Sequence, residues 1–149
     1  MTDHRVVIAG AGYGGLSCAL RLARRVPRGM SVTLVSVTDQ GTLSELSCLE
    51  PAISADGSRV AFKSFATNLV DGDLNEEQDV FLRDLVRGTT ERVSVASDGV
   101  QGNTYSSQPA LSADGKHLAF FSSADNLVPF DTNGEGDLFV RSFGKIRLR

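Results

Sequence analysis

The sequence of 149 residues is short of cysteine, of basic charge and of long apolar runs. Its two cysteines, Cys18 and Cys48, have neither the spacing of metal ligands nor the density of a disulfide scaffold. Lysine and arginine total 15 against 18 aspartates and glutamates, so a strongly basic nucleic-acid-binding surface is excluded. No apolar run approaches the roughly 18 residues of a membrane-spanning helix. The composition predicts a soluble globular chain that binds neither nucleic acid nor membrane.

A signal peptide is the other targeting feature to consider, because residues 6–18 form a short apolar stretch. This stretch is rich in glycine, and its charged residues, Arg21, Arg24 and Arg25, follow it rather than precede it. No small-residue cleavage site closes it. We therefore expect a cytoplasmic protein.

A glycine motif of the form G-x-G-x-x-G lies between a predicted buried strand at residues 6–9 and a predicted helix at residues 16–25. A second strand is predicted at residues 31–35. In a dinucleotide site, such glycines allow a tight turn, let backbone N–H groups approach a pyrophosphate and let the helix pack against the strand. The candidate cofactor-binding residues are Gly10, Gly12, Gly14 and Gly15.

This segment resembles the FAD- or NAD-binding start of pyridine-nucleotide-disulfide and NADH-dehydrogenase-type flavoproteins, whose openings are similar to residues 6–24. The resemblance implies FAD or NAD as a cofactor and an oxidoreductase activity. The chain departs from that family at Ser36, where an acid should bind the ribose hydroxyls, and the rest of such an enzyme is absent. We expect a truncated Rossmann-like β-α-β segment at residues 1–34 that retains no cofactor, with retained FAD or NAD binding as the alternative.

Residues 35–149 contain an internal repeat. The motif P-A-x-S-A-D-G occupies residues 51–57 and returns at residues 109–115, so the repeat has a 58-residue period. A-F and D-x-F motifs that follow keep the same offset, which indicates a repeat architecture. Each unit is predicted to contain four short strands, and its Asp-Gly pair suits a tight hairpin. The predicted strands include residues 59–64, 79–84 and 91–95 in the first unit, and residues 117–122, 137–142 and 146–149 in the second.

The two units resemble the TolB-like, or WD-like, β-propeller repeat through P-x-x-S-x-D-G, A-F-x-S and D-(V/L)-F-(L/V)-R. The resemblance implies a mainly β fold with about two four-stranded propeller blades after the Rossmann-like segment. Closed propellers have roughly four to eight blades, so two blades leave apolar faces and sheet edges open. Self-association or association with other propeller blades is therefore expected. Four phenylalanines recur at the repeat spacing and are predicted to form the core between the blades: Phe62, Phe81, Phe120 and Phe139.

One loop of each unit carries alternating oxygen-bearing side chains, a pattern found in calcium-binding loops. No bidentate glutamate follows at the twelfth position, so a loop with solvated acids and Asx turns is the simpler interpretation. The candidate calcium ligands are Asp73, Asn75 and Asp79 in the first unit, and Asp131, Asn133 and Asp137 in the second.

No arrangement of serine, histidine and aspartate in the sequence predicts nucleophilic catalysis, since His4 lies in the tail and His117 matches the solvent position of Arg59. We therefore predict a non-catalytic β-propeller repeat fragment that binds a protein, peptide or glycan. Such a fragment is expected to be a fusion or truncated gene product. The alternative is a flavin- or nicotinamide-dependent oxidoreductase represented by its dinucleotide-binding start.

Overall fold

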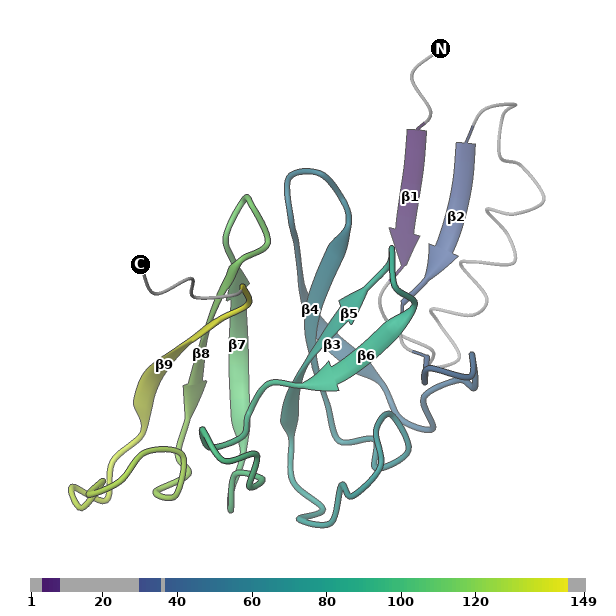
Figure 1. Ribbon diagram of the computed structural model, residues 1–149. Helices are drawn as coiled ribbons and strands as arrows, with labels where there is room; N and C mark the ends of the chain where they lie inside the picture. The colour runs from purple at the N-terminus through teal and green to yellow at the C-terminus, as the bar shows by residue number, and fades with distance from the viewer. Residues whose placement is uncertain (1–3, 9–29, 36, 145–149) are drawn as a thin grey trace.

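The computed structural model describes residues 4–8, 30–35 and 37–144, and its ribbon is shown in Figure 1. These residues form nine strands in three sheets, and no helix is assigned among them. The described residues accordingly include no helix long and apolar enough to cross a membrane. The fold is mainly β, as the sequence predicts.

The first two strands, β1 (His4–Ile8) and β2 (Met30–Leu34), pair in parallel. The predicted helix at residues 16–25 and the glycine motif at residues 10–15 lie outside the described residues.

The first unit of the repeat forms a four-stranded antiparallel sheet in chain order. Its strands are β3 (Cys48–Ile53), β4 (Arg59–Ser64), β5 (Asp79–Asp84) and β6 (Thr89–Arg92). The turn between β3 and β4 is closed by Gly57, whose φ of 67° is a left-handed conformation that glycine adopts without strain. The Asp-Gly hairpin expected from the sequence is therefore present.

The second unit forms a three-stranded antiparallel sheet with the same local geometry. Its strands are β7 (Ser106–Leu111), β8 (His117–Ser122) and β9 (Asp137–Ser142). Each begins one repeat period after its counterpart in the first sheet. The fourth strand predicted for this unit, residues 146–149, lies outside the described residues.

The outer strand of the first sheet ends earlier than the sequence pattern suggests. Residues 91–95 are predicted as a strand, but β6 ends at Arg92. The amide of Val93 still donates to Val80 O at 2.7 Å, whereas the amide of Val95 donates to Val93 O at 2.8 Å. This second bond closes a tight turn, which leads the chain away from the first sheet and toward the second.

The first sheet buries both of its faces. On the face that we call the far face, Val60, Phe62 and Phe81 pack into a hydrophobic cluster with Val35 and Leu69. The rings of Phe62 and Phe81 stack with centroids 5.8 Å apart. The prediction that these two phenylalanines lie between the units is therefore wrong, because the alternation of side chains along β4 and β5 points them to the opposite side.

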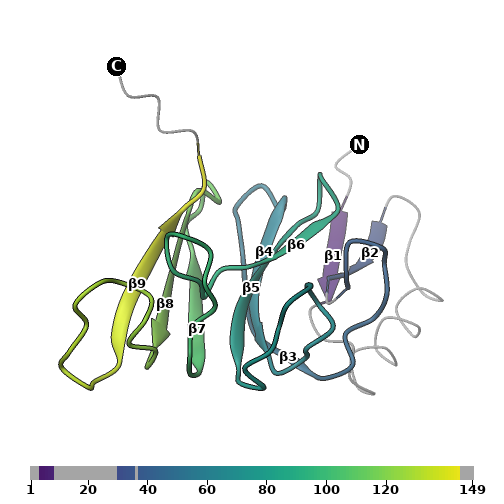
Figure 2. The same ribbon diagram turned by 60° about the horizontal axis from the view of Figure 1, so that its bottom comes forward.

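The other face of the first sheet packs against the second sheet. Val80 and Leu82 share a buried cluster with Leu118 and Phe120, and Phe139 packs against it. The rings of Phe120 and Phe139 lie 5.7 Å apart, so this second pair does lie in the core between the two units. Figures 1 and 2 show the β7–β9 sheet on one side of the β3–β6 sheet and the β1–β2 pair on the other.

Candidate functional site

The loop before β5 brings the first three candidate calcium ligands together around an arginine. Asn75 Nδ2 donates to Asp79 Oδ2 at 3.3 Å. Arg92 Nη1 lies 3.1 Å from Asp73 Oδ1 and 3.8 Å from Asp79 Oδ2. Gln101 Nε2 donates to the same two oxygens, at 2.8 and 3.0 Å. A guanidinium and two amides therefore face the oxygens that a metal ion would need.

Asp79 is fully buried in this cluster. Burial raises the pKa of its carboxyl group, while hydrogen bonds from Ser94 and Gln101 act in the opposite direction. The bond from Ser94 Oγ to Asp79 Oδ1 is 2.5 Å long. Nowhere in residues 4–8, 30–35 and 37–144 do three His, Cys, Asp or Glu side chains gather as metal ligands would. The contacts favour a structural ion pair here, and calcium binding stays a prediction.

The second candidate loop is open to solvent. Asn133 Nδ2 donates to Asp137 Oδ2 at 3.3 Å, and Asn133 Oδ1 accepts the amide of Glu135 at 2.9 Å in an Asx turn. Asp131 is partly exposed. Calcium binding by this loop also stays a prediction.

The four candidate cofactor-binding glycines, at positions 10, 12, 14 and 15, lie outside the described residues. Binding of FAD or NAD therefore stays a prediction. The parallel pairing of β1 and β2 agrees with the strand order expected on either side of that motif.

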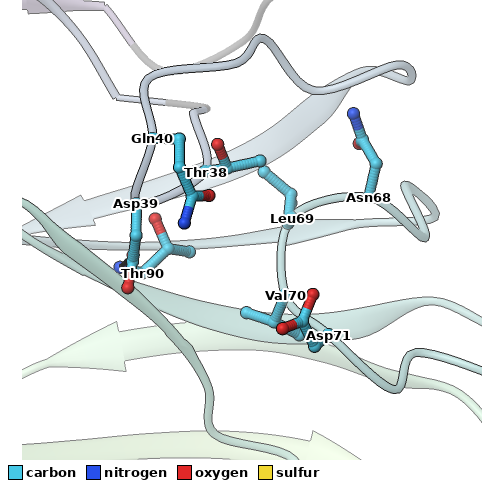
Figure 3. A pocket seen from close by; sticks show the side chains of 8 residues that line it. All are labelled: Thr38, Asp39, Gln40, Asn68, Leu69, Val70, Asp71 and Thr90. Carbon is cyan, nitrogen blue, oxygen red and sulfur yellow. Dashed lines mark hydrogen bonds between the residues drawn. The ribbon is translucent and has the colours of Figure 1, made fainter.

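A polar pocket of about 260 Å³ lies beside the first sheet, and Figure 3 shows its walls. Asp39 and Thr90 lie together on one wall, where Asp39 Oδ1 accepts the amide of Thr90 at 2.6 Å. The Thr90 hydroxyl donates to Val37 O at 2.6 Å. The residues that line the pocket are Thr38, Asp39, Gln40, Asn68, Leu69, Val70, Asp71 and Thr90.

Arg83 holds one wall of this pocket in place. Its Nη1 donates to Thr90 Oγ1 at 2.9 Å and to Thr38 O at 3.3 Å, and it lies 3.8 Å from Asp39 Oδ1. Burial lowers the pKa of Arg83, and the nearby Asp39 carboxylate opposes this. Arg141, at the same position of the second unit, likewise donates to the carbonyls of residues 93, 95 and 96. The two arginines therefore fasten the segment that enters each sheet, which is a structural role.

Sequence reasoning did not find this pocket, because its walls come from segments that are far apart along the chain. Residues 38–40, residues 68–71 and Thr90 meet only when β4, β5 and β6 have paired. None of these segments carries a motif that would have marked it. The polar groups of the wall are largely engaged with one another, so the pocket is not the strongest candidate for binding.

Among residues 4–8, 30–35 and 37–144, the most unusual surface is the face of the second sheet on which no other strand packs. Leu138 and Val140 are 78% and 68% exposed, whereas their counterparts in the first unit, Val80 and Leu82, are 0% and 2% exposed because the second sheet covers them. Strand pairing places the neighbouring side chains on the same side. We call this surface the open face, and it consists of Ala110, Ala119, Phe121, Leu138 and Val140.

No protein-family model and no curated protein sequence matches the chain. Among solved structures, the chain is similar to the crystal structure of TolB from Acinetobacter baumannii, with 22% sequence identity and a TM-score of 0.39. The match covers 68% of this chain and 20% of the TolB chain. The matched part thus spans a fifth of the length of that protein.

Proposed function

We propose that this chain is a non-catalytic interaction module of the β-propeller type, and that its open face binds another polypeptide. The observation that carries the proposal is the contrast between Val80 and Leu82, which are buried, and their counterparts Leu138 and Val140, which are exposed. Equivalent positions of the two repeat units are therefore buried in the first sheet and exposed in the second.

A protein partner fits this surface better than a small molecule does. Contiguous exposed apolar patches on soluble proteins mark sites of interaction with other proteins or with membranes. The open face is part of a regular sheet and is built from apolar side chains, whereas small-molecule sites are concave and contain a few directed polar groups. A flat apolar sheet face is the kind of surface that another sheet packs against.

Site-specific photo-crosslinking in expressing cells tests the proposal. The photoreactive amino acid p-benzoyl-phenylalanine replaces Leu138 in one variant and Leu74 in a control, because Leu74 is 83% exposed in a loop away from the open face. We expect polypeptide adducts of discrete mass from position 138 and none above background from position 74. Equal adduct yields at both positions, or no adducts at either, would contradict the proposal.

A further inference from the structure

The open face differs from its counterpart on the first sheet in charge as well as in exposure. The face of the first sheet that meets the second carries Arg59, Lys63 and Asp84. Arg59 Nε lies 3.5 Å from Asp84 Oδ2, and Arg59 Nη1 also donates to Gly115 O of the second unit at 2.7 Å. Lys63 Nζ pairs with Glu50 at 2.5 Å. The face of the first sheet that packs against the second unit therefore has charged side chains at its edges.

In the second unit, none of these three positions has an Arg, Lys, Asp or Glu. Arg59, Lys63 and Asp84 correspond to His117, Phe121 and Ser142. His117 Nδ1 and Ser142 Oγ are 3.0 Å apart, so these two polar side chains satisfy each other at the end of the face. Like charges placed opposite one another destabilise a contact between identical surfaces. The open face itself consists of apolar side chains, so it meets its own copy without repulsion of this kind.

The far face of the first sheet is not available to a second molecule. Val60, Phe62 and Phe81 are all almost completely buried within the chain itself. A head-to-tail contact would place a far face from one copy on the open face of the next, and it would first require this cluster to unpack. The accessible contact is therefore the open face against itself.

We propose that a second copy of this chain covers the open face, with the two copies related by a two-fold axis. The inference rests on the proposed function, because it names the polypeptide that the open face binds. Contact between identical patches closes after two molecules, so it gives a discrete dimer and not a filament. Leu138 and Val140 of each copy would lie at the centre of a sandwich made of two three-stranded sheets.

The size of the open face sets the expected strength of this dimer. Three strands about 4.8 Å apart, each about six residues long at roughly 3.3 Å per residue, give a sheet of roughly 14 by 20 Å. This footprint, roughly 280 Å² per copy, is smaller than the roughly 800 Å² per partner of a standard protein interface, so we expect a weak and concentration-dependent dimer.

Sedimentation equilibrium over a range of concentrations is the first test. We expect the wild-type chain to change from monomer to dimer, and Leu138→Lys to raise the dimer dissociation constant at least about tenfold. Leu74→Lys and Val86→Lys are the matched controls, since these residues are 83% and 79% exposed outside the open face, and they should leave the constant unchanged. Circular dichroism on each variant establishes that the monomer stays folded.

Cross-linking tests the two-fold arrangement separately. Val140→Cys is treated with a bismaleimide whose span matches the roughly 10 Å between packed sheets. A two-fold dimer brings the two introduced thiols within reach of one another, so a covalent dimer is expected from this variant. All chains in this experiment also carry Cys18→Ser, so that the buried Cys48 is the only native thiol left. Val86→Cys and the chain without an introduced cysteine should give no covalent dimer.

Failure of this inference can be told apart from failure of the proposed function. A wild-type chain that stays monomeric at all concentrations, yet forms adducts with other proteins at position 138, overturns the dimer and leaves the interaction module standing. Growth beyond the dimer overturns the two-fold contact. A monomer with no specific adducts at position 138 overturns both.

Discussion

A serine and an aspartate fasten the hairpin turn between the first two strands of each unit. In the first unit, Ser54 Oγ donates to Asp56 Oδ1 at 2.6 Å, and the amide of Ser58 donates to the same oxygen at 3.0 Å. These bonds, with the one from Ser54 the largest cause, lower the pKa of Asp56 to about 2. In the second unit, Ser112 lowers the pKa of Asp114 in the same way.

The lowered pKa of Asp56 predicts the direction of a pH effect. The usual value for this carboxyl group is 3.8, so the folded chain binds the proton less readily than the unfolded chain does. Its contribution to stability is complete above the usual value and is lost as the pH falls toward about 2. We expect Ser54→Ala to raise the pKa of Asp56 toward its usual value, as measured by NMR titration of the carboxyl carbon.

The corresponding substitution in the second unit is the control. Ser112→Ala removes the donor to Asp114 and should leave the titration of Asp56 unchanged. A titration of Asp56 that Ser54→Ala does not move would show that the serine hydroxyl is not what stabilises the carboxylate.

The buried ion pair of the first unit predicts unequal effects of removing two aspartates that occupy the same repeat position. Asp79→Ala leaves Arg92 and the donors Ser94 and Gln101 without one carboxylate, and should cost about 3–5 kcal/mol. Asp137→Ala removes a carboxylate with one side-chain donor and should cost less than about 1 kcal/mol. Urea denaturation of both variants measures the difference, and equal costs would contradict the structural role of the first cluster.

At the scale of elements, the two Asp-Gly turns have the same conformation but different neighbours. Gly57 and Gly115 both have a φ of 67°. A Cβ on Gly57 would meet nothing within 4 Å, whereas one on Gly115 would lie 3.2 Å from Arg59 Cδ and 3.3 Å from Ser54 Cβ. The second turn therefore packs closely against the first sheet.

This difference predicts the result of a matched pair of substitutions. Gly57→Ala should cost about 1–2 kcal/mol, from the left-handed backbone alone. Gly115→Ala should cost roughly 1 kcal/mol more, because the methyl group also crowds the interface between the sheets. Thermal or urea denaturation gives both values. Equal losses of unfolding free energy in the two variants would show that the added methyl group at position 115 fits between the sheets without strain.

Strand positions could be predicted from the sequence where local chemistry determines them. Alternating side chains and flanking turn residues marked β4, β5, β8 and β9 at the bounds that the structure has. The end of β6 could not be predicted, since the turn at Val95 is held by Arg141 from a later strand. The insertion of Arg92 between two aspartates was missed for the same reason: the contact exists only after β5 and β6 pair.

At the scale of the whole molecule, the two repeat units have different surroundings. The sequence predicts that two units leave apolar faces open, but the repeat period alone does not say which faces. Within the described part of the chain, the first sheet is covered on both faces and the second sheet on one. In the repeat numbering, β2 (Met30–Leu34) corresponds to residues 88–92, which contain the outer strand β6. The β1–β2 pair therefore occupies the position that the outer strand of a preceding unit would have.

The central proposal is that the open face is where this chain binds a second copy of itself. Methyl NMR spectra recorded over a range of protein concentrations test it most directly, with the resonances of Leu138 and Val140 compared with those of Leu74 and Val86. These four side chains are similarly exposed, and two of them lie on the open face. We predict that raising the concentration shifts or broadens the resonances of Leu138 and Val140 and leaves those of Leu74 and Val86 unchanged. No change at any of the four side chains, equal shifts at all four, or shifts at Leu74 and Val86 with none on the open face would each contradict this proposal.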